Sequence, residues 1–125
     1  MEMFDKNCVF CKIIQKEIPS EIIKETENIL VIKDLHPKAP YHYLVIPKKH
    51  IVNLNYIKDN DLFYVTEMGK VIRDISKDIQ KEKGLNKPLP FNLISNNETE
   101  AGQSVFHMHW HFLSGKNFYE GDLKL

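Results

Sequence analysis

Hydrophobic residues recur at intervals of three or four between residues 60 and 80, which is the spacing of an amphipathic helix. Asp59 or Asn60 is suited to cap the N-terminus of this helix, and Gly84 is suited to end it. The apolar positions expected on its buried face are Leu62, Phe63, Val65, Met68, Val71, Ile72, Ile75 and Ile79. This segment is therefore predicted to be one long helix packed on the rest of the chain.

Other segments are typical of strands, because β-branched and aromatic residues lie between turn residues. The predicted strands lie in residues 21–33 (two strands around a turn at Glu27–Asn28), 41–47, 90–95 and 105–113. A short helix is predicted over residues 8–17, where Val9, Ile13 and Ile14 fall at helical spacing before Pro19.

Together these elements predict an α+β fold: an antiparallel sheet of about five strands, one long helix and a short N-terminal helix. The chain has 125 residues and shows no internal repeat or linker. Residues 1–125 are therefore expected to form a single domain.

Residues 105–113 (VFHMHWHFL) alternate large apolar side chains with three histidines. Successive side chains of a strand point to opposite faces, so His107, His109 and His111 are expected on one face. The opposite face would carry Phe106, Met108, Trp110 and Phe112. An exposed polar face that happens to use histidine is one interpretation. A functional site is favoured, because imidazoles bind zinc or present a nucleophilic nitrogen to phosphorus.

The balance of charges excludes recognition by bulk electrostatics. Lys and Arg number 17 and Asp and Glu number 17, so the formal net charge is zero without histidine. A nucleic-acid-binding protein usually carries a net basic face, so nucleic acid is not expected as a partner. Arg73 is the only arginine, so a phosphate site would have to use lysine, histidine or backbone amides.

The sequence also lacks the signals of an exported or membrane protein. Glu2, Asp5 and Lys6 interrupt the segment where a signal peptide needs an apolar run. No apolar run approaches the roughly 20 residues of a membrane span, and two nearby cysteines cannot form a disulfide framework. We therefore expect a cytoplasmic protein without a membrane partner.

Residues 107–113 (HMHWHFL) resemble the His-x-His-x-His-x-x signature, with apolar x, of the histidine triad (HIT) superfamily. Other segments similar to this family are residues 10–14 with 17–19, residues 34–37 with 42–50, and residues 101–106 (AGQSVF). The resemblance covers nearly the whole chain. The short length and the Gly-Gln-Ser sequence before the triad most resemble the Hint branch, the nucleoside phosphoramidases.

This resemblance implies a catalytic mechanism. The middle histidine of the family attacks the α-phosphate of a nucleotide, which makes His109 the nucleophile and gives a covalent nucleotidyl-histidine. Water then releases the nucleoside monophosphate. His111 and His42 would polarise phosphate oxygens, and Ser104 with nearby backbone amides would stabilise developing charge or assist the leaving group. No organic cofactor is expected.

The resemblance also implies a nucleotide-binding surface for a purine nucleotide or a conjugate such as AMP. Asp34 would accept hydrogen bonds from the ribose hydroxyls, although capping a turn is an alternative role for it. The base would sit among Val9, Phe10, Ile13, Ile18, Ile32 and Leu35, each of which could instead be plain core. Contacts to the phosphate or ribose would come from Asn96, Gly102, Ser104, His109 and His111. His36 has no assigned role.

The Cys-x-x-Cys pair formed by Cys8 and Cys11 suits either a redox dithiol or half of a zinc site. A thioredoxin-like interpretation needs a βαβ context, which the predicted elements do not provide. Bacterial relatives in the superfamily use two cysteines, a central histidine and the first triad histidine to hold structural zinc. The resemblance therefore implies zinc ligation by Cys8, Cys11, His50 and His107, with two free thiols as the alternative.

Family members of this size are typically homodimers, with the long helix and the C-terminal segment at the interface. Here residues 114–125 offer Phe118, Tyr119 and Leu123 as contacts. Other functions remain open: a Fhit-like hydrolase of dinucleoside polyphosphates, a non-catalytic nucleotide-binding protein, or a metal hydrolase with the triad on zinc. The last would need carboxylate ligands beside the triad, and the sequence places none there.

Overall fold

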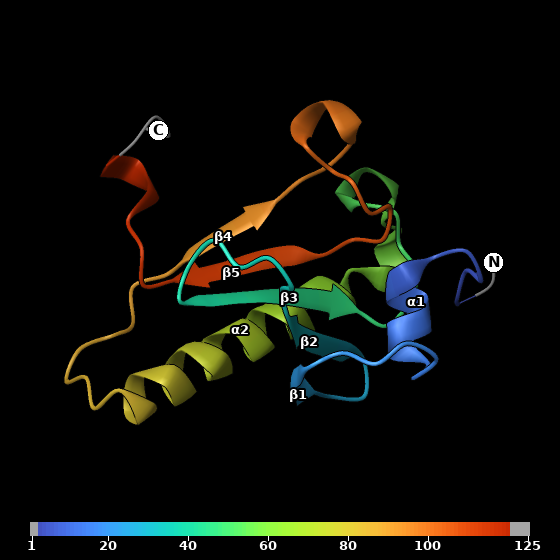
Figure 1. The fold of residues 1–125 in the computed structure, drawn as a ribbon. Helices are drawn as coiled ribbons and strands as arrows, with labels where there is room; N and C mark the ends of the chain where they lie inside the picture. Colours follow the sequence, from blue (N-terminus) through green and yellow to red (C-terminus); the bar gives the residue numbers. More distant parts are fainter. Residues whose placement is uncertain (1–2, 121–125) are drawn as a thin grey trace.

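The computed structural model describes residues 3–120, which form an antiparallel sheet with a long and a short helix packed on it (Figure 1). The five strands lie in the order β1-β2-β3-β5-β4, so β1 and β4 are the edges of the sheet. In chain order the elements are α1 (Val9–Ile14), β1 (Ile22–Glu25), β2 (Ile29–Lys33), β3 (Tyr41–Pro47), α2 (Phe63–Glu82), β4 (Asn92–Ser95) and β5 (Trp110–Ser114). The predicted α+β architecture is confirmed.

α2 packs on one face of the sheet, and α1 packs on the other face against β2 and β3, toward one end of the strands (Figure 1). Ile29 and Val31 of β2 pack in the cluster that contains α2, whereas Leu30 and Ile32 pack in the cluster that contains α1. This explains why β2 reads as a continuous apolar run and not as an alternating one. The two layers hold β3 and β5, which carry the candidate site, in a rigid framework.

The buried face of α2 agrees with the predicted spacing from Met68 onward, but the start of the helix does not. A 3-10 turn at Asp59–Asp61 precedes α2, and Leu62 occupies the N-cap without a side-chain hydrogen bond. Neither Asp59 nor Asn60 caps the helix, so this prediction is wrong. Leu62 and Phe63 are 48% and 47% exposed. Tyr64 replaces them on the buried face because it lies four positions before Met68.

The C-terminal end of α2 follows the prediction. The helix ends at Glu82, and Gly84 adopts φ +66°, a left-handed conformation that glycine tolerates without strain.

The last two strands are shorter than predicted. β4 begins at Asn92 and β5 at Trp110, so residues 105–109 lie outside the sheet. There the backbone N–H of Met108 donates to the carbonyl oxygen of Ile51 at 2.6 Å, and Phe106 is half exposed. Met108, Trp110 and Phe112 still pack on the α2 side, as expected from the alternation. The strand prediction is therefore wrong for the segment that carries His107 and His109.

Phe118 and Tyr119 lie in a 3-10 turn (Phe118–Glu120) after β5, whereas Leu123 lies outside the described residues. Within residues 3–120, no helix combines the length and the apolar character needed to cross a membrane.

Candidate active site and metal centre

The structure brings His42, His109 and His111 together at the junction of β3 and β5. His42 lies on β3 and His111 on the neighbouring strand β5, and Nε2 of His42 is 2.9 Å from Nδ1 of His111. His109 lies just before β5, and its ring centroid is 5.2 Å from that of His111. Three segments distant in sequence thus meet here, because α1 places Phe10 edge-on to His109 with the ring centroids 5.0 Å apart.

His109 has the hydrogen bonding of a nucleophile. Its Nδ1 lies 2.8 Å from the carbonyl oxygen of His107. A carbonyl only accepts, so Nδ1 carries the proton and Nε2 keeps its lone pair. His109 is 9% exposed, and burial lowers its pKa, which keeps the ring neutral. A neutral imidazole with a free nitrogen is the form that attacks an electrophile.

His42 and His111 are also neutral at pH 7. Burial lowers the pKa of His42. Burial, and then the neighbouring His109 and His42, lowers the pKa of His111 to about 4. Nδ1 of His42 accepts a hydrogen bond from the backbone N–H of Lys38 at 3.0 Å.

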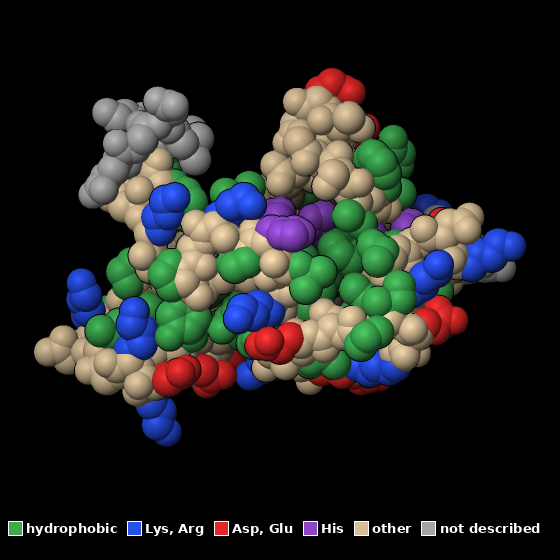
Figure 2. Space-filling view, viewed as in Figure 1, with side chains coloured by type: hydrophobic (Ala, Val, Ile, Leu, Met, Phe, Trp, Pro, Cys, Tyr) green, Lys and Arg blue, Asp and Glu red, His purple; other side chains and the backbone are tan. Residues whose placement is uncertain are grey.

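A cavity of about 400 Å³ opens beside this pair and is lined by Asp34, His42, Asn96, His111 and Phe118 among others. Figure 2 shows histidine side chains in a hollow of the surface. Asp34 Oδ1 accepts the backbone N–H of His36 at 2.8 Å, so this carboxylate does cap a turn. Its Oδ2 lies 3.5 Å from His42 Nε2. Asp34, His42 and His111 each offer one possible metal-ligand atom, and these atoms lie within 4.8 Å of one another.

The loop between β4 and β5 is anchored by Gln103, which sequence reasoning did not assign to the site. Gln103 is 3% exposed, and its amide nitrogen donates to the carbonyl oxygens of Val52 and Val105 at 2.7 and 3.1 Å. Its Oε1 accepts from the side chain of Asn53 and from the backbone of Glu98, both at 2.9 Å. The one signal available was its position between the two predicted site residues Gly102 and Ser104.

The loop that Gln103 anchors also carries the three residues predicted to contact the phosphate or ribose, Asn96, Gly102 and Ser104. Asn96 donates to the carbonyl oxygen of Ala101 at 2.9 Å, and Gly102 adopts φ +93°, which favours glycine. Ser104 is exposed and lines a separate cavity of about 430 Å³ that also reaches Cys8 and His50. Asn96 therefore lies beside His111, whereas Ser104 lies on the side of the cysteines.

The residues expected to surround a base divide into two groups. Phe10, Ile13 and Ile32 are buried in the core between α1 and the sheet, and Ile18 packs against them. Val9 and Leu35 are 41% and 86% exposed, so only these two present substantial surface to a ligand. The alternative of plain core packing holds for the buried members of the set.

A second cluster, called the metal-ligand cluster below, consists of Cys8, Cys11, His50 and His107. Each residue offers one ligand atom, and these atoms lie within 4.8 Å of one another. Cys8 Sγ is 3.3 Å from His107 Nδ1, and Cys11 Sγ is 3.4 Å from His50 Nδ1. The tight first turn of α1 brings both thiols to one point, because the N–H of Cys11 donates to Cys8 Sγ at 3.4 Å.

The chemistry of this donor set fits a metal ion. His107 is fully buried, and its Nε2 donates to the carbonyl oxygen of Pro47 at 2.8 Å, so its Nδ1 lone pair faces the thiols. Burial raises the pKa of Cys11 to about 11 and burial lowers the pKa of His107 to about 4. A cation would stabilise the thiolate that burial disfavours. The four residues could therefore hold a metal ion.

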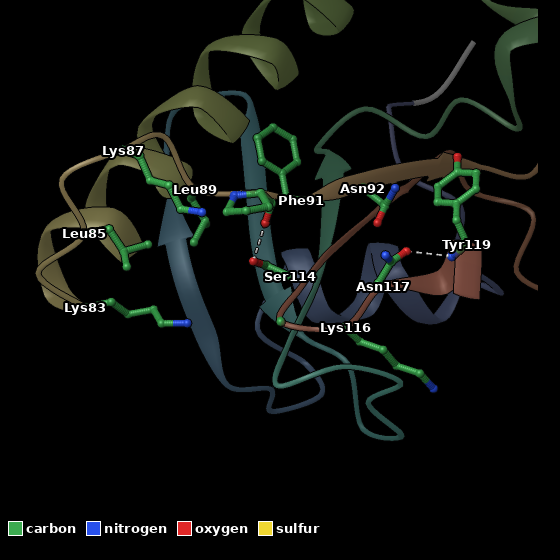
Figure 3. Close-up of a pocket in the computed structure, with 12 residues that line it drawn as sticks. Lys83, Leu85, Lys87, Leu89, Phe91, Asn92, Ser114, Lys116, Asn117 and Tyr119 are labelled. Carbon is green, nitrogen blue, oxygen red and sulfur yellow. Dashed lines mark hydrogen bonds between the residues drawn. The ribbon is translucent and has the colours of Figure 1, made fainter. Parts of the chain in front are cut away.

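Another cavity, of about 590 Å³, lies elsewhere (Figure 3). The described residues that line it include Lys83, Lys87, Phe91 and Tyr119, and none of them is a histidine or a cysteine. It is therefore separate from the group of His42, His109 and His111 and from the metal-ligand cluster.

Comparison with known proteins agrees with this geometry. Residues 7–122 match the family model described as "Scavenger mRNA decapping enzyme C-term binding". An uncharacterized HIT-like protein from Chlamydia muridarum is 40% identical over 107 residues, which are 86% of this chain and 80% of that protein. The chain belongs to the HIT-like family.

Solved HIT structures share the fold over nearly all of this chain. A HIT family hydrolase from Clostridium thermocellum has a TM-score of 0.83 at 39% identity and covers 97% of this chain and 99% of its own. A histidine triad protein from Clostridium difficile has a TM-score of 0.81 at 40% identity and covers 99% and 100%. The HIT-like assignment thus confirms the resemblance seen in the sequence.

Proposed function

We propose that this HIT-like protein is a nucleotide hydrolase that cleaves the P–N bond of purine nucleoside phosphoramidates through a covalent intermediate on His109. The observation that supports this most directly is the hydrogen bond from His109 Nδ1 to the carbonyl oxygen of His107, which leaves Nε2 free. The hydrolase names of structural relatives support the same class of reaction.

In the first step, Nε2 of His109 attacks the α-phosphorus. The P–N bond breaks, its electron pair goes to the amine nitrogen, and the amine leaves after taking up a proton. In the second step, water adds to the phosphorus and the bond between phosphorus and Nε2 breaks. The products are the nucleoside monophosphate, one released proton and neutral His109.

The residues around the cavity would bind the nucleotide. Asp34 Oδ2 is available to accept a ribose hydroxyl, because Oδ1 already accepts the backbone N–H of His36. Exposed Val9 and Leu35 would contact the base of AMP. Asn96 lines the same cavity as His111 and would face the phosphate or ribose. Ser104, near the cysteine side, would face the leaving group.

We propose zinc as the occupant of the Cys8, Cys11, His50 and His107 cluster. Two thiolates and two imidazoles are the donor set of a closed structural zinc site. Zinc would supply folding energy there and would leave the chemistry to the histidines of the triad. Chelation should therefore lower stability and leave the activity of folded protein unchanged.

The hydrolysis of adenosine 5′-phosphoramidate tests the proposal. We expect wild-type activity to resist chelator, and His109→Ala to lower kcat/KM at least about 1,000-fold because it removes the nucleophile. The comparison variant is His36→Ala, which removes an exposed imidazole that lines the same cavity and so separates loss of the nucleophile from loss of an imidazole at the site. Equal activity in wild type and His109→Ala would refute the proposal. Loss of activity on chelation without unfolding would indicate a metal hydrolase.

A dinucleoside polyphosphate hydrolase is the second candidate, because attack by the same histidine on an α-phosphate would also cleave a P–O–P bond. Turnover of diadenosine polyphosphates without turnover of the phosphoramidate would favour it. Nucleotide binding without turnover of either compound would indicate a non-catalytic nucleotide-binding protein.

A cytoplasmic homodimer is proposed as the working state. Phe91 and Leu93 are 37% and 44% exposed at the edge strand β4, and Tyr119 is exposed nearby in the chain end that follows β5. Light scattering should give the mass of two chains. Leu93→Lys should shift the mass toward one chain, whereas Ile22→Lys, at an exposed position of the opposite edge strand β1, should not.

A further inference from the structure

We propose that the backbone N–H of Lys38 fixes the protonation of His42 and, through it, makes His111 a permanent hydrogen-bond donor that does not act as an acid. The inference rests on the proposed hydrolysis only for its catalytic consequence. The proton arrangement itself follows from hydrogen-bond geometry. Lys38 and His42 are therefore positioning residues, and the group they position is Nε2–H of His111.

The first constraint is the contact between Lys38 and His42. A backbone N–H can only donate, and that of Lys38 points at His42 Nδ1 at 3.0 Å. Nδ1 of His42 must therefore carry a lone pair. A neutral imidazole holds one proton, so His42 carries it on Nε2. A doubly protonated His42 would place two N–H groups against each other at this contact.

The second constraint follows from the first. Nε2–H of His42 lies 2.9 Å from Nδ1 of His111, so His111 must accept there and carry its own proton on Nε2. The other polar group near His42 Nε2 is Asp34 Oδ2 at 3.5 Å, which is also an acceptor. The Asp34 carboxylate thus favours the same tautomer of His42 that the N–H of Lys38 requires. The lowered pKa values of both rings agree with a neutral pair.

This arrangement excludes a metal ion bound through His42 Nε2 at Asp34, His42 and His111, although their atoms lie close together. A metal would need the lone pair of Nε2, and the proton would then have to move to Nδ1, against the N–H of Lys38. The three residues therefore form a hydrogen-bonded group and not a cation site.

The arrangement also defines what His111 does in the reaction. Neutral His111 would become an imidazolate if it gave up its only proton, and a second proton on Nδ1 would face the N–H of His42. His111 therefore keeps its proton throughout and donates a hydrogen bond to a phosphate oxygen as negative charge develops there. The proton that the departing amine takes up therefore does not come from His111.

Nitrogen NMR of histidine-labelled protein tests the proton arrangement without substrate. At pH 7 we expect His42 and His111 to show only the Nε2–H form. Lys38→Pro removes the N–H and should give a mixture of tautomers on His42, whereas Lys38→Ala removes only the ammonium group and should match wild type. A Nδ1–H form in wild type, or identical spectra for the proline and alanine variants, would overturn the proposal.

A second pair of variants covers the case in which Lys38→Pro does not fold. Glutamine can place an amide N–H where the ring Nε2–H of His42 lies, whereas leucine cannot donate. We expect His111 to keep the Nε2–H form alone in His42→Gln and to show both tautomers in His42→Leu. The same tautomer mixture in both variants would contradict the role of His42.

The catalytic consequence is measured with two substrates. Adenosine 5′-phosphate carrying an alkylamine needs a proton on its leaving group, and the 4-nitrophenyl ester does not. We expect His111→Leu to lower kcat/KM by about 100-fold on both, because a donor to the phosphate is lost. A loss at least ten times larger on the amine substrate would show that His111 is an acid. Failure of wild type to use either substrate would refute the proposed function and leave the NMR result intact.

Discussion

His107 links the metal-ligand cluster to His109, the proposed nucleophile. The ring Nδ1 of His107 is 3.3 Å from Cys8 Sγ, and its carbonyl oxygen accepts the hydrogen bond of His109 Nδ1 at 2.8 Å. A third contact, from ring Nε2 to the carbonyl oxygen of Pro47, ties the residue to the end of β3. The nucleophile is thus oriented by a residue that is held at three points.

Removal of zinc should destabilise the protein. Protein prepared in zinc-containing medium without chelator is expected to contain one zinc per chain by elemental analysis. Cys8→Ala should abolish zinc binding and lower the free energy of unfolding by several kcal/mol, because metal binding in such sites is folding energy. Chelator should lower Tm of wild type and leave Tm of Cys8→Ala unchanged. An unchanged Tm in both cases would contradict the site.

The exposure along α2 predicts two contrasting stability effects. Met68 is fully buried, so Met68→Ala should cost about 2–5 kcal/mol through lost burial and the cavity left behind. Phe63 on the same helix is 47% exposed, so Phe63→Ala should cost much less, under about 1 kcal/mol. Urea unfolding measures both. Equal losses would mean that Phe63 lies on the buried face after all.

Acid should destabilise the fold partly through His111. Its pKa is about 4 in the folded chain and about 6.5 in an unfolded one, so the unfolded state binds more protons between these values. Stability therefore falls as pH drops from about 6.5 to 4. In His111→Asn this slope should decrease by up to about 1.4 kcal/mol per pH unit. Urea titrations of wild type and His111→Asn at pH 7, 6 and 5 measure the two slopes, and equal slopes would contradict this contribution.

Gln103 should be essential for the loop before the triad. Gln103→Leu would leave the carbonyl oxygens of Val52 and Val105 and two donors without their partner. We expect a loss of about 2–4 kcal/mol in the free energy of unfolding, since buried polar groups lose their hydrogen bonds. Gln15→Leu, at an exposed position, is the control and should be close to neutral. Similar values for the two variants would argue against the anchoring role.

Sequence patterns predicted the elements well where burial follows a regular period. The buried positions of α2 from Met68 to Ile79 and the locations of the first three strands agree with the structure. The pattern failed at residues 105–109, which alternate like a strand but lie outside the sheet. Apolar and polar residues alternate in any extended segment with one buried side. A segment held by side-chain and loop contacts therefore has the same alternation as a strand that pairs in a sheet.

The metal-ligand cluster and the hydrogen bond from Lys38 to His42 could not be predicted from the hydrophobic periodicity of the sequence. Cys8 and His107 are 99 positions apart and meet only because α1 packs against the end of the sheet. Their association was inferred from resemblance to a family and not from spacing. The N–H of Lys38 belongs to the backbone, so no side-chain pattern could indicate its contact with His42.

The sequence by itself determined the α+β class, the family and the residue types available for chemistry. These follow from local periodicity and from motifs that are continuous in the chain. Only the tertiary structure decided which nitrogen of each site histidine carries the proton, and which of the predicted base contacts are exposed. Hydrogen-bond direction and burial depend on atoms brought together from distant segments, and those distances exist only after the chain has folded.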